Sequence, residues 1–325
     1  MLDWKQLNNH LKRLLDLEGR KDVTIRRLAS SKRPVDGALI FASDPDSAIL
    51  AGLENVADCV VILPVRLRER SHSIARNNSV IIADDPRYRF AEILNAVAMP
   101  QDLRGRLFYD DKRHIYLGTD VKIDPSAYVE PGASISTCSK LEAGAYVMTG
   151  ARIGPNVTIG MNSVIKENCV VGGWGYGYAL SHGKPPLRLP HLGGVKIGDD
   201  CEVGSFTTVC SGTIEPTIIR DHAKIDDHVH IAHNCDIGEG AMVVACAEVS
   251  GSVKVGRHSW LGPNCSIIDR ITIGEDCVVG MGAVVLKSMP DGSVVAGNPA
   301  KLTTDLKRQS ELLKRVEAYL EVHTE

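Results

Sequence analysis

Aliphatic side chains recur at every sixth position along most of the chain, from residue 123 to residue 285. No polar residue occupies the repeating position, and the register is interrupted only twice. A period of six fits neither the 3.6-residue turn of an α-helix nor the simple alternation of an ordinary strand. The repeat therefore indicates a special architecture, built from 24 hexads whose aliphatic residues are Ile123, Val129, Ile135, Leu141, Val147, Ile153, Ile159, Ile165, Val171, Ile197, Val203, Val209, Ile219, Ile225, Ile231, Ile237, Val243, Val249, Val255, Leu261, Ile267, Ile273, Val279 and Val285.

Small side chains and glycines recur in phase with these aliphatic residues. The pattern predicts a left-handed parallel β-helix, in which each hexad forms one side of a triangular coil. The aliphatic residue points inward, the small residue fits near a corner, and the glycine eases the turn. About eight coils, stacked at the spacing of β-strands, would form a prism about 40 Å long. The small residues, four positions after the aliphatic ones, are Ala127, Ala133, Ala145, Ser163, Cys201, Ala223, Cys235, Ala241, Ser259, Cys265, Cys277 and Ala283; the glycines directly after them are Gly154, Gly160, Gly198, Gly204, Gly238, Gly256, Gly262, Gly274 and Gly280.

The cysteines follow the same phase. None of the nine forms a CxxC pair, which argues against a zinc knuckle or a redox motif. Five occupy the small interior position, where a thiol acts as a small buried hydrophobe. We expect a packing role for Cys169, Cys201, Cys235, Cys265 and Cys277.

The first 105 residues lack the hexad and predict a small α/β domain. Trp4, Leu7, Leu11, Leu14 and Leu15 recur at helical spacing, which indicates an amphipathic first helix. Three short apolar runs follow, and Asp84-Asp85-Pro86 is typical of the start of a second helix. We expect strands at 38–41, 59–65 and 79–83, a helix at 87–97, and a small α/β domain at 1–105.

The C-terminal segment, 299–325, predicts a helix after the β-helix domain of residues 106–298. Pro290 and Asn298-Pro299 end the β pattern, and Leu306, Leu313, Val316 and Leu320 then form an apolar stripe on a charged helix. The stripe must pack on another subunit's helix or on the prism itself. In both cases we expect the helix to cap the last coil, whose open edge would otherwise pair with other strands.

Two interruptions of the hexads predict loops outside the prism. The first, residues 172–194, contains Gly-Gly-Trp-Gly-Tyr-Gly-Tyr followed by three prolines. The second, residues 211–217, adds four residues. Because binding residues are often carried on loops of a rigid scaffold, the first interruption is a candidate substrate-binding segment.

Composition excludes several functional classes. The chain has 37 Lys and Arg against 40 Asp and Glu, a net charge of −3, without the basic excess of a general nucleic-acid binder. The N-terminus is charged and unlike a signal peptide, and no apolar run approaches the ~20 residues of a membrane span. We therefore expect a cytoplasmic protein with reduced thiols and no transmembrane segment.

Four histidines lie within residues 221–234 and form the candidate chemical centre. Carbonic anhydrases of the β-helix type place a metal-binding His at the phase of His233 and a second one five residues later, but Gly238 stands there. A metal is therefore not expected. A neutral imidazole can instead accept the proton of an amine that attacks a thioester. Asp226, one coil side earlier, can orient the ring if the fold brings the two residues together. Solvated side chains remain an open alternative for His222, His228 and His230.

These residues resemble a known family. Ile225-Asp226, Ile231-Ala232-His233-Asn234 and Gly251-Ser252 are similar to LpxD, the UDP-3-O-(3-hydroxyacyl)glucosamine N-acyltransferases of lipid A biosynthesis, within the hexapeptide-repeat acyltransferases. The resemblance covers nearly the whole chain. It includes segments that look like the family's uridine-binding domain, at 28–30, 37–41 and 84–87, and its interrupting loop, at 173–179 and 189–193.

The resemblance implies roles for individual residues. In this family the His matching His233 is the catalytic base, the Asp matching Asp226 supports it, and members are trimers with active sites between neighbouring prisms. The implied substrate-binding residues are Phe41, Asp44, Gly175, Tyr176, Gly177, Tyr178, His191 and Asn234. The implied acyl-donor-binding residues are Gly251, Arg270, Met281, Gly297 and Lys301.

The chain departs from the family in the uracil site. Phe41 matches the Phe that stacks on uracil, but Ser47 stands where the second aromatic residue, a Tyr, belongs, and Asp44 replaces an Asn. Losing one aromatic face removes a stacking contact of about 1 kcal/mol. The identity of the nucleotide therefore stays open.

It also departs near the acyl donor. Arg270 stands where the family has a second His, and Cys210-Ser211 replaces an Asp-Arg pair. The segment Gly297-Asn298-Pro299-Ala300-Lys301 resembles the ending of CoA-dependent sugar acetyltransferases, whereas the family's donor is acyl carrier protein. Either thioester is therefore a possible co-substrate.

We expect an LpxD-like N-acyltransferase, forming a homotrimer without a bound cofactor, that acylates a nucleotide-linked amino sugar from acyl carrier protein or CoA. One alternative keeps the chemistry and changes the molecules: an acetyl-CoA-dependent sugar N-acetyltransferase of surface polysaccharide biosynthesis. Another is a β-helix that serves as an assembly scaffold without catalysis.

Overall fold

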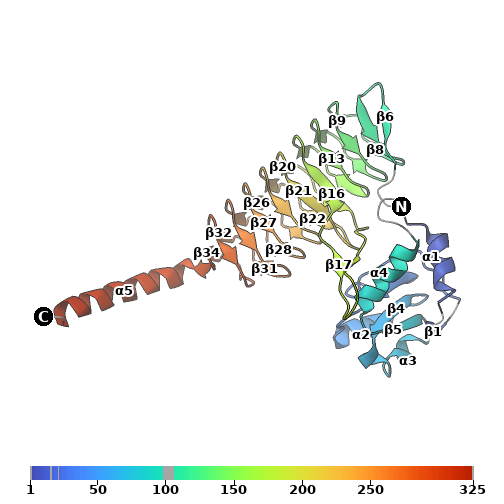
Figure 1. Cartoon of the computed structure of the whole chain (residues 1–325). Helices are drawn as coiled ribbons and strands as arrows, with labels where there is room; N and C mark the ends of the chain where they lie inside the picture. The colour runs from blue at the N-terminus through green and yellow to red at the C-terminus, as the bar shows by residue number, and fades with distance from the viewer. Residues whose placement is uncertain (1, 15–16, 21, 98–105, 324–325) are drawn as a thin grey trace. The chain divides into compact units, whose positions relative to one another are not determined.

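The computed structural model describes residues 2–14, 17–20, 22–97 and 106–323 (Figure 1). It divides into two compact units. The α/β unit comprises Met1–Arg106, Trp174–Gly194 and Gly212–Pro216; the prism unit comprises Leu107–Gly173, Val195–Ser211 and Thr217–Glu325. Within the described residues, none of the helices is long and apolar enough to cross a membrane.

The α/β unit is built on a five-stranded sheet in the order β1-β5-β4-β3-β2, in which only β1 runs antiparallel to its neighbour. Three of these strands form the three apolar runs of the sequence, as predicted. The strands are β1 (Leu17–Gly19), β2 (Arg27–Leu28), β3 (Ala38–Phe41), β4 (Val60–Pro64) and β5 (Ser79–Ala83).

Helices cover both faces of this sheet. Alternate strand residues divide between two cores: Leu39 and Ile62 pack with α1 and α4, whereas Ile40 and Val61 pack with α2 and α3. The alternation follows from the period of two along a strand. The helices are α1 (Trp4–Leu11), α2 (Ser47–Glu54), η1 (Val65–Leu67), α3 (Ser71–Ile74) and α4 (Pro86–Val97). The predicted helix at 87–97 is confirmed, whereas the sequence pattern missed α2, η1 and α3.

The first helix is shorter than its apolar spacing suggested. Asp3 caps it by accepting hydrogen bonds from the backbone N–H groups of Lys5 and Gln6, at 2.9 and 3.0 Å. Leu7 and Leu11 are buried, but the helix ends at Leu11, so Leu14 follows it. Leu15 lies outside the described residues.

The first interruption of the hexads is a packed part of the α/β unit. It contains an antiparallel hairpin of β17 (Tyr178–Ala179) and β18 (Leu187–Arg188). Ala179 and Leu189 are buried in the same core cluster as the α4 residue Phe90. The segment that we expected as an external loop therefore has secondary structure and contributes to the core of the α/β unit.

The prism unit consists of three parallel sheets, which form the sides of the stacked coils in Figure 1. We call them sheets I, II and III. Sheet I contains, in spatial order, β33 (Val284–Val285), β30 (Ser266–Ile267), β27 (Glu248–Val249), β24 (His230–Ile231), β21 (Thr208–Ser211), β16 (Val170–Trp174), β13 (Arg152–Ile153), β10 (Ser134–Ile135), β7 (Ile115–Leu117) and β6 (Phe108–Asp110).

The other two sides have the same construction. Sheet II contains β31 (Thr272–Ile273), β28 (Lys254–Val255), β25 (Asp236–Ile237), β22 (Thr217–Ile219), β19 (Val195–Ile197), β14 (Val157–Ile159), β11 (Lys140–Leu141) and β8 (Lys122–Ile123). Sheet III contains β35 (Lys301–Leu302), β34 (Val294–Ala296), β32 (Val278–Val279), β29 (Trp260–Leu261), β26 (Met242–Val243), β23 (Lys224–Ile225), β20 (Glu202–Val203), β15 (Val164–Ile165), β12 (Tyr146–Val147) and β9 (Tyr128–Val129).

The strand register confirms three hexads per coil. Ile135 pairs with Ile153 and Ile225 with Val243, each 18 residues on. All 24 predicted aliphatic residues belong to one core cluster or pack against it, and only Ile123 and Val129, at its start, are partly exposed. The five cysteines at the small interior position are buried, as predicted.

The backbone conformation that turns the chain at the corners differs from the predicted one. The residue three positions after the aliphatic one has a positive φ, as at Asn156, Asn162 and Asn264. Asn and Gly adopt this left-handed conformation most readily. The glycines directly after the aliphatic residue do not have a positive φ, so the expectation that they ease the turn is wrong. They let adjacent coils approach: a Cβ on Gly256 would lie 2.4 Å from the backbone of Gly274.

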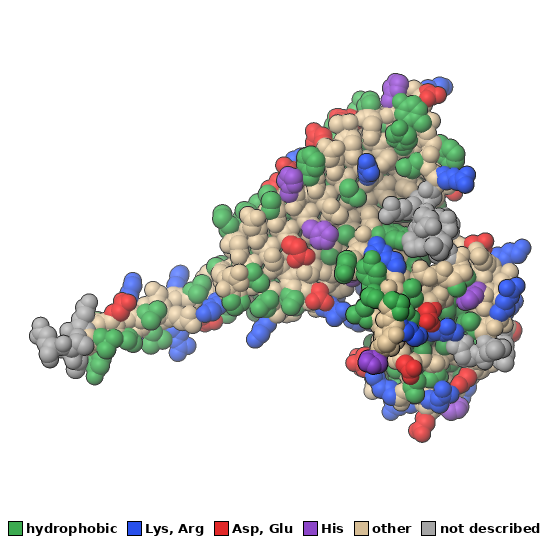
Figure 2. Space-filling view, viewed as in Figure 1, with side chains coloured by type: hydrophobic (Ala, Val, Ile, Leu, Met, Phe, Trp, Pro, Cys, Tyr) green, Lys and Arg blue, Asp and Glu red, His purple; other side chains and the backbone are tan. Residues whose placement is uncertain are grey.

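The C-terminal helix, α5 (Thr303–His323), does not cap the last coil. Instead β35 runs antiparallel along β34 and covers that edge of sheet III. Leu313 and Val316 are 62% and 50% exposed, so the stripe does not pack on the prism of its own chain. Figure 2 shows hydrophobic side chains along this helix. Of the two predicted partners, another subunit's helix remains a prediction.

The two glycine roles predict different costs of substitution. Gly256→Ala places a methyl group against the backbone of the next coil and should lower stability by about 1–3 kcal/mol. Gly292→Asn, at a corner with φ of 67° and no atom within 4 Å of a new Cβ, should cost less than about 1 kcal/mol. Urea unfolding followed by circular dichroism measures both. Equal urea midpoints of unfolding for the two variants would contradict the different roles given to these two glycines.

Candidate active site

His233 lies in the turn that follows β24, where sheet I meets sheet II; we call this turn the His233 corner. Its ring is half-buried, and its Nδ1 lies 3.1 Å from Oδ1 of Asn234. A carbonyl oxygen only accepts hydrogen bonds, so in this arrangement Nδ1 carries the hydrogen. The basic lone pair of the neutral ring is then at Nε2.

Asn234 suits this position for a backbone reason as well. It is the corner residue with a positive φ, 62°, a conformation that Asn adopts readily. Its backbone N–H donates to Oγ1 of the buried Thr217, on the preceding coil, at 2.8 Å. The turn that presents His233 is therefore held by the coil beneath it.

Gly251 stacks on His233 from the next coil. A Cβ at this glycine would lie 2.9 Å from Cε1 and 3.1 Å from Nε2 of the imidazole, so only glycine leaves room for the ring. The backbone N–H of Ser252 donates to the carbonyl of His233 at 2.9 Å, which fixes the two coils in register.

The backbone N–H of Gly251 is a candidate anion-binding group. At the equivalent turn positions Ala245 and Glu275, the N–H donates to a carboxylate oxygen, at 3.1 and 2.8 Å. In the part of the chain that the structure describes, Gly251 N–H has no such acceptor. This N–H can therefore stabilise negative charge that develops beside His233.

Arg270 lies one coil further along the same corner. Its backbone N–H donates to the carbonyl of Gly251 at 3.0 Å. Its side chain is 76% exposed and lies 3.4 Å from the Asp269 carboxylate. Four of the predicted site residues, His233, Asn234, Gly251 and Arg270, therefore share one corner.

Asp226 is on a different corner, where sheet III meets sheet I. We call it the Asp226 corner. Its carboxylate accepts hydrogen bonds from the backbone N–H groups of Asp227 and Ala245, at 2.8 and 3.1 Å. Within one chain the fold does not bring Asp226 to the His233 imidazole, because a full side of the coil separates the two corners. The orienting role of Asp226 stays a prediction.

Met281 also lies on the Asp226 corner, in a turn after β32, and is 73% exposed.

The sequence pattern missed a stacked aromatic pair on this corner. The rings of Phe206 and His228 are 5.2 Å apart and nearly parallel, at 4°. Both occupy the corner position with a positive φ, on consecutive coils, and this shared hexad phase was the signal in the sequence.

The other histidines of the cluster have different surroundings from those of His233. His222 Nδ1 lies 3.7 Å from a carboxylate oxygen of Asp200, and His230 is exposed on sheet I. No group of three or more His, Cys, Asp or Glu that could hold a metal ion occurs within the described residues.

Cys235, next to the site, is not a nucleophile. Burial raises the pKa of its thiol to about 12, so the thiol is protonated at neutral pH. Its Sγ lies 3.1 Å from the carbonyl of Ser250, to which it donates. The side chain that can perform acid–base chemistry at this corner is the imidazole of His233.

The predicted nucleotide-binding residues lie in the α/β unit. Phe41 is half-buried, 4.8 Å from the ring of Phe90, and exposed Asp44 pairs with Arg66 at 2.5 Å. In the hairpin segment Tyr176 is 89% exposed, 5.1 Å from the ring of Tyr178.

Two glycines with predicted roles differ in their surroundings. A Cβ on Gly177 would lie 2.4 Å from the imidazole of the buried His191, which makes this glycine a spacer for that ring. Gly175 accepts a hydrogen bond from the backbone N–H of Gly177 at 3.0 Å. These substrate-binding roles stay predictions.

Two predicted donor-binding residues lie at the C-terminal end of the prism. Gly297 has a φ of 90°, and its carbonyl accepts from the N–H of Val284 at 3.0 Å. Lys301 is exposed in β35, paired with Ala296. The structure thus distributes the predicted donor-binding residues over both corners and the C-terminal edge.

A family of known proteins shares the repeat. The bacterial transferase hexapeptide family (six repeats) matches residues 138–173, 216–251 and 252–287, the second range containing both His233 and Gly251. In these three ranges the repeat of this chain is similar to that family's.

Several curated relatives are named UDP-3-O-acylglucosamine N-acyltransferase. The protein from Herminiimonas arsenicoxydans is 27% identical over 165 residues, 50% of this chain and 47% of that protein. That from Campylobacter lari is 34% identical over 146 residues, 45% of this chain and 46% of the relative. The matched part of the chain thus spans less than half of the length of these relatives.

Solved structures support the fold. The UDP-N-acetylglucosamine acyltransferase of Arabidopsis matches with a TM-score of 0.52 and 24% identity, over 65% of this chain and 75% of that one. The corresponding enzyme of Francisella novicida matches with a TM-score of 0.54 and 23% identity, over 66% and 79%. The left-handed parallel β-helix predicted from the hexads is confirmed.

The thiols provide a test of this arrangement. Iodoacetamide at pH 8 should modify exposed Cys246 in the native protein and leave Cys169, Cys235 and Cys265 unmodified, because burial raises the pKa of each of these three to about 12. Peptide mass spectrometry before and after urea unfolding reads out each site. Rapid native labelling of Cys235 would contradict its placement inside the corner.

Proposed function

We propose that the chain is an N-acyltransferase that moves an acyl group from a thioester, on acyl carrier protein or CoA, to the amino group of a nucleotide-linked amino sugar. The observation that carries the proposal is the stack of His233 and Gly251, with Asn234 bound to Nδ1 of the imidazole. It is supported by the names of relatives that match about half of the chain.

The proposed reaction begins at Nε2 of His233. As the amine nitrogen of the sugar forms a bond to the thioester carbon, Nε2 takes the proton from that nitrogen. The electron pair of the C=O bond moves to oxygen, and the backbone N–H of Gly251 stabilises this oxyanion. The C–S bond then breaks, the imidazolium returns the proton to the leaving thiolate, and an amide and a free thiol result.

Asn234 has a positioning role in this scheme. By accepting from Nδ1–H, its amide oxygen holds the tautomer whose lone pair is at Nε2. The amide also fixes the ring beside Gly251, so that the base and the oxyanion donor keep their relative positions. The Phe41 region and the hairpin segment of the α/β unit are proposed to recognise the nucleotide.

The active sites are proposed to form between copies of the chain in a homotrimer. Asp226 and Met281 lie on one corner of the prism, and His233, Gly251 and Arg270 on another. Residues from both corners can serve one site only if the Asp226 corner of one copy meets the His233 corner of the next. An exposed apolar stripe on α5 is consistent with assembly.

Two substitutions test the chemistry. His233→Gln should lower kcat by about 10²–10⁴-fold, because the proton acceptor is removed. Asn234→Gly keeps a residue suited to the positive φ but removes the acceptor for Nδ1, and should lower kcat with little effect on KM. Formation of the amide from a UDP-linked amino sugar and hydroxyacyl carrier protein is measured by mass spectrometry.

The same assay distinguishes the two possible acyl donors, acyl carrier protein and CoA. A control variant accompanies it. Gly292→Asn, at an open corner outside the site, is expected to keep full activity. Turnover with acetyl-CoA and none with hydroxyacyl carrier protein would replace the lipid A substrate by a short acyl group. Wild-type rates in folded His233→Gln would overturn the catalytic assignment and favour a scaffold.

Subunit mixing tests the shared site. His233→Gln and Asp226→Asn homo-oligomers should each have reduced activity, whereas isolated mixed trimers should recover it at about one third of their sites, where an intact His233 meets an intact Asp226. Two affinity tags isolate the mixed oligomers. If mixing restores nothing, His233 and Asp226 do not act together across a subunit boundary.

A further inference from the structure

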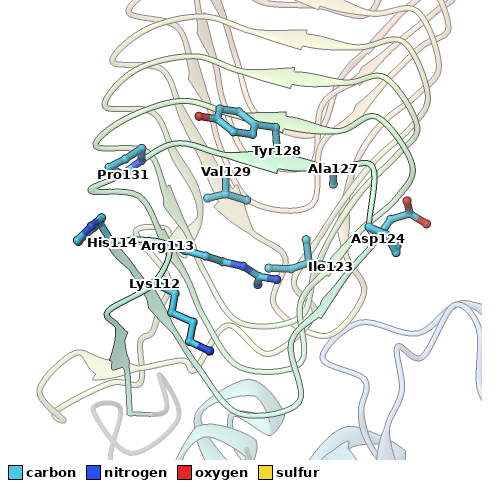
Figure 3. Close-up of a pocket in the computed structure, with 10 residues that line it drawn as sticks. Lys112, Arg113, His114, Ile123, Asp124, Ala127, Tyr128, Val129 and Pro131 are labelled. Atoms are coloured by element: carbon cyan, nitrogen blue, oxygen red, sulfur yellow. The ribbon is translucent and has the colours of Figure 1, made fainter.

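The N-terminal end of the prism contains a cavity of about 580 Å³ that the proposed chemistry does not use (Figure 3). Sheets II and III end at β8 and β9, the strands of the first hexads, whereas sheet I continues into the β6–β7 hairpin. The hairpin turn therefore stands beyond the ends of the other two sheets. The cavity lies between this turn and the first coil, and its size is typical of small-molecule sites.

The floor of the cavity is apolar because the prism core starts here. Ile123, Ala127 and Val129 occupy hexad positions whose equivalents in later coils are fully buried, but among the residues that the structure describes no coil covers them on the N-terminal side. They are only partly buried. Figure 3 shows the side chains of Ile123 and Val129 pointing into the same space. An apolar tail laid against them would continue the core by burying this surface.

The rim of the cavity is basic. Lys112, Arg113 and His114 are consecutive in the hairpin turn, and all three are exposed. Figure 3 shows Arg113 reaching from the turn toward Ile123. Within the described ranges no carboxylate oxygen lies within 4.0 Å of the side-chain nitrogens of Lys112 or Arg113. Their charge is therefore available to a ligand.

Two of the acidic residues nearby, Asp110 and Asp124, already accept hydrogen bonds. Asp110 Oδ1 accepts from the backbone N–H groups of Lys112 and Arg113, at 2.9 and 3.2 Å, and this holds the turn. Asp124, the carboxylate that lines the cavity, accepts from the N–H and Oγ of Ser126, at 2.9 and 2.6 Å. His114 Nδ1 is 3.0 Å from the hydroxyl of Tyr109, which fixes its ring at the rim.

We propose that this cavity binds a single-chain amphiphile with an anionic head group, of the class of medium-chain fatty carboxylates. The tail lies against Ile123, Ala127 and Val129, and the head pairs with Lys112 and the guanidinium of Arg113, which matches a carboxylate with two donors. An apolar floor and uncompensated cations at one edge select for both parts of such a molecule.

The test is calorimetric titration of the full chain with decanoate below its micelle concentration. Decanoate should bind, and Lys112→Ser/Arg113→Ser should weaken binding at least tenfold. Lys122→Ser/Lys254→Ser, which removes two exposed lysines of sheet II outside the cavity, is the matched control and should bind as the wild type does. Acetate and 1-decanol, the head and the tail alone, should each bind at least tenfold more weakly.

A decanoate analogue with a photoreactive tail locates the site. Labelling should fall within residues 107–131 and be lost in Lys112→Ser/Arg113→Ser. Labels at the His233 or Asp226 corner instead would mean that the ligand occupies the proposed acyl-transfer site and would overturn the inference. Absence of decanoate binding, equal affinity for 1-decanol, or unchanged binding by the double variant would also overturn it.

Discussion

The hydrogen bonding of each coil to the next, at an interval of 18 residues, is the constraint on which the prism depends. It aligns the aliphatic residues and the small interior residues in columns, so about two residues in six are enough to build a continuous core. It also favours corners that turn in the same way, and most of them have a positive φ at the third residue after the aliphatic one. A corner that failed to turn would misalign all of the columns after it.

The same constraint decides which residues form a site. His233, Gly251 and Arg270 are far apart in sequence, yet they stand on one corner because each lies about one coil from the next. Asp226 is only seven residues from His233, but it belongs to the preceding hexad and therefore to another corner. In such a fold, residues of neighbouring hexads lie on different corners, whereas residues that are a multiple of 18 apart in the sequence lie on the same corner.

This rule explains which features of the structure could be predicted from the sequence. The repeat predicted the prism and the buried cysteines, because both depend on periodicity. Within one chain the structure leaves Asp226 one side of the coil away from His233, as the hexad phase of the two residues implies. The role of Asn234 was missed because its side-chain hydrogen bond depends on the backbone conformation of the corner. The helices α2 and α3 lack a repeat, and short helices give a weak pattern.

The interruptions of the hexads have a consequence for how the chain folds. Ile159 pairs with Ile197, 38 residues on, where Leu141 pairs with Ile159 after 18. Because the entropy of closing a loop grows only with the logarithm of its length, this longer connection costs about 0.7 kcal/mol more than an uninterrupted coil. A β-helix can therefore carry a whole hairpin at one corner with little loss of folding free energy. Each corner is a place where new sequence can be inserted without rebuilding the scaffold.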